Sequence, residues 1–172
     1  MIPISFRAIT VLTLLLFSIA LFSPGYRAQQ QVRDHLTEEE ADRVREAQII
    51  DLRIDVFMFA ADRRLLVLTN PNAIQKKKEE EQWGPLPKGS KLELISDLRK
   101  IYSEAMEKID DASERKKGDP VLAKALDKLK KAAGRHVAEM RALQPKLTEK
   151  REVNALLEAI EEAEVASKGT LQ

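Results

Sequence analysis

The chain has 172 residues and contains no cysteine. That absence excludes a disulfide framework, thiolate zinc sites and cysteine nucleophiles. Aromatic residues are scarce at 5%, and three of the five phenylalanines (Phe6, Phe17 and Phe22) fall within the first 22 residues. The chain also lacks a large excess of either sign of charge, because it has 29 basic and 28 acidic side chains. A formal net charge of +1 argues against nucleic-acid binding, which needs a clustered basic surplus.

Motifs that carry catalysis or metal binding are also missing. The two histidines are His35 and His136, and neither follows a glutamate by three residues, as the helical di-iron pattern requires. The His-Glu-x-x-His, P-loop, Gly-x-Gly-x-x-Gly and EF-hand motifs are absent, and no nucleophile elbow occurs. We therefore expect no catalytic, cofactor or metal site, and a protein that is not an enzyme.

The N-terminus has the pattern of a secretory signal peptide. Arg7 precedes an almost wholly apolar run at 8–22, and Ser23-Pro24-Gly25 then breaks any helix. We predict a signal peptide over residues 1–28, with cleavage near 25–28. An uncleaved anchor is the alternative, although the run is shorter than the about 20 residues that a membrane span needs. Membrane contact is expected only through this segment, if it is kept.

The remainder predicts one helical domain at 37–169, after a polar leader at 29–36 and before a tail at 170–172. The predicted fold is all-α: an elongated antiparallel bundle of four main helices plus a short charged connector helix. Loop signals at Asn70-Pro71, Gly118, Pro145 and Gly169 separate the elements. The predicted helices are 37–69, a connector within 72–82, 90–117, 119–144 and 149–167.

Helix starts are marked by capping residues. Thr37 with Glu40, and Ser90 with Glu93, form capping boxes, in which a hydroxyl and a carboxylate satisfy backbone N–H groups reciprocally. Asp119 precedes a proline at the first helical position, where a missing N–H costs nothing. Thr148 is the predicted cap of the last helix.

Three of the predicted helices carry apolar stripes that step by three and four residues, which is typical of helices in a bundle. Short links between them favour antiparallel neighbours. The stripes are Ile95, Leu98, Tyr102, Ala105, Ile109 and Ala112; Leu122, Leu126, Leu129, Ala133, His136, Met140 and Leu143; and Val153, Leu156, Ile160 and Ala163.

The first predicted helix is apolar over most of its circumference, so we expect it to be central and largely buried. Its polar stripe runs through Asp51, Asp55 and Asp62. These carboxylates face solvent in the first interpretation, pair with arginines of another helix in the second, and bind a cation or act in acid–base chemistry in the third. Their role and that of His136 stay open. Phe57 is predicted to face the core, whereas Phe59 lies along the stripe and is a candidate partner contact.

Trp83 is the only tryptophan, and it stands between the charged connector and an irregular loop at 84–89. It either packs the loop onto the bundle or is exposed as an anchor for a partner. Phe59 and Trp83 are therefore the predicted partner-contact residues.

Two five-residue stretches, 36–40 and 147–151, resemble the Leu-Thr-x-x-Gln motif of small helical periplasmic stress chaperones. The fifth position is Glu40 in one and Arg151 in the other, so we do not assign the chain to that family. We expect an exported, periplasmic or extracellular, non-enzymatic interaction or scaffold protein of the bacterial-type cell envelope, with an unidentified protein partner. The alternative that the resemblance implies is a chaperone that holds unfolded clients on a helical surface. The oligomeric state stays open.

Overall fold

The computed structural model describes residues 33–116 and 118–170. The predicted signal peptide, residues 29–32 of the predicted leader and residues 171–172 lie outside these ranges. All regular elements of the described residues are helices, so the predicted all-α class is confirmed. In chain order they are α2 (Glu38–Glu46), α3 (Ile50–Thr69), α4 (Lys77–Trp83), α5 (Lys91–Arg115), α6 (Pro120–Leu143), the 3-10 turn η1 (Gln144–Lys146) and α7 (Lys150–Lys168).

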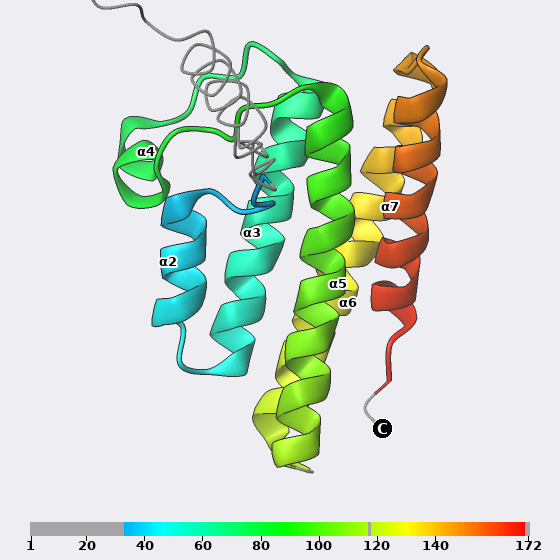
Figure 1. The fold of residues 1–172 in the computed structure, drawn as a ribbon. Coiled ribbons are helices and arrows are strands. Elements are labelled where there is room, and N and C mark those ends of the chain that lie inside the picture. The colour runs from blue at the N-terminus through cyan, green and yellow to red at the C-terminus, as the bar shows by residue number, and fades with distance from the viewer. Residues whose placement is uncertain (1–32, 117, 171–172) are drawn as a thin grey trace, which may run out of the picture. The chain divides into compact units, whose positions relative to one another are not determined.

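The long helices α3, α5, α6 and α7 surround one hydrophobic core (Figure 1). Apart from the short α4, successive helices along the chain run in opposite directions, as the short links predict. However, α5 and α6 lie across the bundle from each other, and each packs mainly on α3 and α7. The neighbours α3 and α6 are therefore parallel, and their ion-pair partners stay 73 to 77 residues apart in sequence along both helices. The prediction that short links make direct neighbours is wrong for α5 and α6.

The predicted helix 37–69 is two helices, with a turn at residues 47–49. Neither proline nor glycine marks this turn. Glu40 contacts Arg63 at 2.6 Å, although 23 residues separate them and would span about 35 Å in one helix. The chain must therefore fold back between them. The guanidinium of Arg53 stabilises the turn by donating to the carbonyl oxygen of Ala47 at 2.8 Å and 3.2 Å.

Most of the predicted caps are present. Thr37 with Glu40 and Ser90 with Glu93 form complete capping boxes, and Asp119 accepts a hydrogen bond from the N–H of Val121. The Thr148 cap is wrong, because α7 begins one residue later than predicted and its N-cap, Glu149, makes no side-chain cap hydrogen bond. The connector helix is present as α4, shifted toward Trp83.

The predicted apolar stripes of α5, α6 and α7 do enter the core. Their members are buried except Ala112, Leu126 and Val153, which are half-buried. The expectation that α3 is largely buried is also confirmed, since its core-facing side includes Ile54 and Phe57 at 0% exposure. Leu36 and the carbonyl of His35 contact the bundle too, so this part of the predicted leader packs with the domain.

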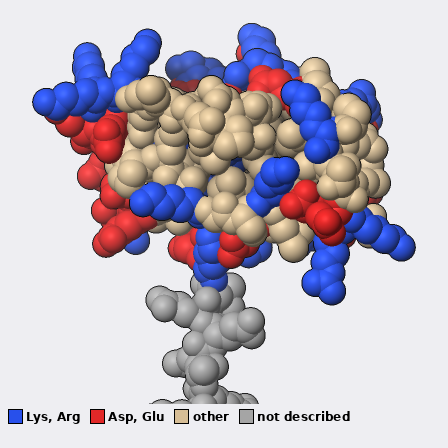
Figure 2. All heavy atoms as spheres, turned by 90° about the horizontal axis from the view of Figure 1, so that it is seen from above, with Lys and Arg blue, Asp and Glu red and all other residues tan. Residues whose placement is uncertain are grey.

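No helix of the described ranges combines the length and the apolar character needed to cross a bilayer. Figure 2 views the end of the bundle where α3 ends and α5 begins, and there uncharged side chains occupy the middle of the surface while charged side chains of both signs surround them. Ile74, in the link between α3 and α4, is 95% exposed.

Candidate functional site

The two predicted partner-contact residues, Phe59 and Trp83, lie against each other. Phe59 belongs to α3 and Trp83 is the last residue of α4, and their ring centroids are 4.4 Å apart. The guanidinium of Arg43, from α2, lies 5.0 Å from the centroid of the Trp83 ring, within the range of a cation–π interaction. Trp83 thus packs α4 onto α2 and α3 while part of its ring stays at the surface.

Two arginines hold the backbone around Trp83. Arg43 donates to the carbonyl oxygen of Gln82 at 2.7 Å and 2.9 Å, and Arg63 donates to those of Gly84 and Pro85 at 3.1 Å and 2.5 Å. Gly84 has a φ of 67°, and a Cβ there would lie 2.4 Å from the side chain of Glu39. Only glycine fits this turn, which follows Trp83 directly, without strain.

Two adjoining grooves meet at Phe59 on the outer surface of α3. The first has a volume of about 450 Å³ and lies toward α2 and α4. The second has a volume of about 420 Å³ and lies toward α6. Both are lined by Asp55 and Phe59. The first groove also contains Leu52, which is 48% exposed. We call these two grooves together the α3 surface.

The aspartates of the α3 stripe pair with cations of α6. Asp51 is 4% exposed, and its carboxylate lies 2.7 Å from Lys124 and 3.1 Å from Lys128. Asp55 lies 2.5 Å from Lys128. Hydrogen bonds from Lys124 and Lys128 lower the pKa of Asp51. The interpretation of a solvent stripe is wrong for Asp51, and the alternative of ion pairs to another helix holds. Lysines are the partners of Asp51 and Asp55. Asp62 has the expected arginine, Arg135, at 2.8 Å.

Asp62 begins a chain of hydrogen bonds that joins three helices. Its carboxylate lies 2.8 Å from Nε2 of His136, on α6, and Nδ1 of that ring lies 2.5 Å from the hydroxyl of Tyr102, on α5. Burial raises the pKa of Tyr102, so its hydroxyl keeps its proton. It donates to Nδ1 in the tautomer that carries the imidazole proton on Nε2. The carboxylate of Asp62 can only accept, so the Nε2–H group of His136 donates to it. The sequence alone assigns His136 no role, and in the structure it connects the core to the α3 surface.

A carboxylate, an imidazole and a hydroxyl in this order form the arrangement that activates a nucleophile in hydrolases. In this protein His136 and Tyr102 both have 0% exposure, so no substrate reaches the hydroxyl. The chain of hydrogen bonds instead satisfies buried polar groups and aligns α3, α5 and α6.

Asp62 also gives stability a dependence on pH. Burial alone would raise its pKa, but hydrogen bonds from His136 and Arg135 outweigh burial and lower it below the ordinary 3.8. Because the folded-state pKa is the lower one, the stabilisation is complete above about pH 5 and is lost as the pH falls below 3.8.

We expect Asp62→Asn to lower the free energy of unfolding by about 1.5–3 kcal/mol at neutral pH, the usual contribution of a hydrogen bond to a charged group. The difference from the wild type should shrink at pH 3. Urea unfolding at both pH values measures it. Asp110→Asn, at an exposed position of α5, is the control and should stay within about 0.5 kcal/mol of the wild type. A difference that persists unchanged at pH 3 would contradict this assignment of the charge.

A buried cluster of charges lies beneath α2. Glu40 is 0% exposed and accepts hydrogen bonds of 2.6 Å from Arg63 and Arg64, which are each 1% exposed. Arg64 also donates to the carbonyl oxygen of His35 at 2.6 Å and lies 3.8 Å from Asp97 of α5. This cluster fastens the start of the domain, α3, the loop after α4, and α5 to one another.

Within residues 33–116 and 118–170, no group of three or more His, Asp or Glu side chains is arranged to hold a metal ion. The chain matches no protein-family model, and no match to it was found among curated proteins or solved structures.

Sequence reasoning missed the partners that shape this site. Arg43, Arg63 and Tyr102 carried no motif, and Tyr102 looked like an ordinary member of an apolar stripe. One signal was available: the adjacent pair Arg63-Arg64 interrupts the most apolar helix of the chain. Two arginines at such positions indicate buried carboxylate partners, because an unpaired buried charge is very costly.

Proposed function

We propose that the chain is an exported, non-enzymatic protein of the bacterial-type cell envelope that binds a protein partner through the α3 surface. The N-terminal pattern of Arg7 followed by the apolar run at 8–22 supports export to the periplasm or beyond, with cleavage near 25–28. The proposal includes the signal peptide and a mature domain built on four main helices.

The observation that carries the proposal is the meeting of two grooves at Phe59. Leu52 remains 48% exposed on a helix whose other face is buried. A large apolar side chain beside an aromatic pair, in a concave surface with a charged rim, has the composition of a protein-binding patch. The rim carries both signs, including Glu46 and Lys131, which favours a protein segment over a nucleic acid.

We expect Leu52→Ser and Phe59→Ala to weaken association with the partner while the bundle stays folded, because both side chains line the α3 surface. Crosslinking in intact cells, followed by mass spectrometry of the envelope fraction, identifies the partner and measures its yield. Leu157→Ser is the matched control: Leu157 is 47% exposed on α7, away from both grooves. Equal loss of the partner with all three variants would contradict a role for this surface.

The same cells test export. An intact Met1 on a product in the cytosolic fraction would contradict it. The competing function, a chaperone for unfolded clients, predicts many unrelated crosslinked proteins and suppression of their aggregation at stoichiometric amounts. Leu36 and Leu147, which carry the chaperone resemblance, are each 8% exposed. They pack in the core and offer no surface to a client, so we place the scaffold function first.

A further inference from the structure

A second concave site lies at the opposite end of the bundle from that shown in Figure 2, where α3 begins, α5 ends and α6 begins. Its volume of about 510 Å³ falls within the range of about 300–1,000 Å³ that is typical of small-molecule sites. Its apolar wall consists of Ile49, Ile50, Ala112, Val121 and Leu122. We call it the basal pocket.

The charges around the basal pocket are mainly positive. Four basic side chains line it: Arg53, Lys108, Arg115 and Lys116. The single acidic lining residue, Asp119, caps α6 through the N–H of Val121 at 2.9 Å. Lys108 lies 3.5 Å from Glu107 and 4.0 Å from Glu104, and Arg115 lies 3.9 Å from Asp111, all on α5. These ion pairs are partly exposed and are weak in water. Arg53 and Arg115 also donate to backbone carbonyl oxygens, which leaves their charge in place.

Ile49 is placed against the usual preference. It is the N-cap of α3, a position where serine, threonine, asparagine and aspartate are strongly favoured and isoleucine is disfavoured. The side chain is also 50% exposed, at the mouth of the pocket. Neither helix capping nor core packing explains an isoleucine here. In addition, the positive ends of the α3 and α6 dipoles lie beside the pocket. They outnumber the single negative end there, that of α5, so the dipoles together favour an anion.

We infer that the basal pocket binds a single-chain anionic amphiphile, such as a fatty acid, with its alkyl chain on the apolar wall and its carboxylate among the four cations. Charge complementarity selects an anion, and the apolar wall selects an alkyl chain over a hydrophilic anion. The concave shape favours a monomeric molecule over a flat bilayer surface. This site shares no lining residue with the α3 surface, so either proposal can fail without the other.

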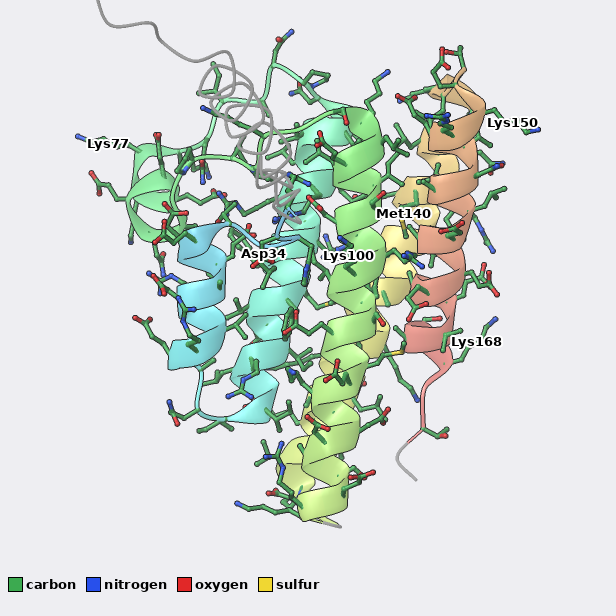
Figure 3. All side chains as sticks on the ribbon, in the orientation of Figure 1. Asp34, Lys77, Lys100, Met140, Lys150 and Lys168 are labelled. Atoms are coloured by element: carbon green, nitrogen blue, oxygen red, sulfur yellow. The ribbon has the colours of Figure 1, made fainter. Side chains whose placement is uncertain are left out.

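Isothermal titration calorimetry of the detergent-free chain with sodium dodecanoate, kept below its micelle concentration, tests this inference. We expect one molecule bound per chain. Arg115→Gln combined with Lys116→Gln should weaken binding about tenfold, because two of the four cations are lost. The matched control combines Lys150→Gln with Arg151→Gln, a loss of the same charge at the start of α7, far from the pocket (Figure 3). Its affinity should equal that of the wild type.

Two further variants examine the apolar wall. Ala112→Phe should abolish binding by filling the pocket, and Ile49→Ser, at a half-exposed position, should weaken it without disturbing the core. Circular dichroism confirms that each variant is folded. If Ala112→Phe does not fold, the affinity of Ile49→Ser for dodecanoate tests the role of the apolar wall.

Three results would overturn the inference. Equal binding of dodecanol or dodecyltrimethylammonium would show that the cations do not select the ligand. Equal weakening by the Arg115/Lys116 double variant and by the control double variant would show that dodecanoate does not bind at the basal pocket. Binding to phosphatidylglycerol vesicles without binding to monomeric dodecanoate would identify a membrane-contact surface instead.

Discussion

Phe57→Ala should lower the free energy of unfolding by about 3–5 kcal/mol, the usual cost of removing a buried phenylalanine ring and leaving a cavity. Phe57 has 0% exposure on α3 and belongs to the core that α5 and α6 complete. The loss would be a large part of the 5–15 kcal/mol that stabilises a domain of this size. Urea or thermal unfolding followed by circular dichroism measures it.

Phe59→Ala is the matched control for this prediction. Phe59 lies two residues further along α3 and is only half-buried, against Trp83. Its truncation should cost clearly less, since the ring is already partly in water. If neither variant melts below the wild type, α3 is not the centre of the core and the packing described above is wrong.

Glu40→Gln should destabilise the protein by about 3–5 kcal/mol, because it leaves two buried guanidinium groups without a full counter-charge. Judged from the sequence alone, Glu40 is an ordinary capping-box residue, and losing a helix cap costs about 1 kcal/mol. The size of the effect therefore separates the two roles. Chemical denaturation at neutral pH provides the measurement.

Glu93→Gln supplies the comparison within the same chain. Glu93 occupies the equivalent position of the second capping box, at an exposed site of α5. Glu93→Gln should lower the free energy of unfolding by about 1 kcal/mol or less. If Glu40→Gln costs no more than Glu93→Gln, Arg63 and Arg64 are not held by a buried carboxylate in solution.

The features predicted correctly from the sequence depend on neighbouring residues. Ser90 caps α5 and Asp119 caps α6 because each acts on N–H groups two or three residues away. The stripes of α5, α6 and α7 follow from the helical repeat, and they place Leu98, Leu129 and Leu156 in the core. Thr148 is an exception. It is a residue type that favours the N-cap position, but the N-cap of α7 is the next residue, Glu149.

The candidate site was predicted only in part. The residue types of Phe59 and Trp83, and their places beside a polar stripe and a charged connector, indicate them as contact residues. Their contact required α4 to lie beside α2 and α3, which depends on hydrogen bonds from Arg43 and Arg63 to the loop backbone. Those bonds join residues 39 and 21 positions apart, and no local periodicity encodes them.

The sequence by itself determined the helical class, three of the helix starts and the faces of α5, α6 and α7 that enter the core, because capping and amphipathicity act over a few residues. Tertiary structure decided which helices are neighbours, the turn at residues 47–49, and the partners of Asp51, Asp62 and Glu40. The physical reason is desolvation. A carboxylate on an apolar helix can remain in water or be buried against a cation, and the choice depends on whether another helix brings a lysine, arginine or histidine to it.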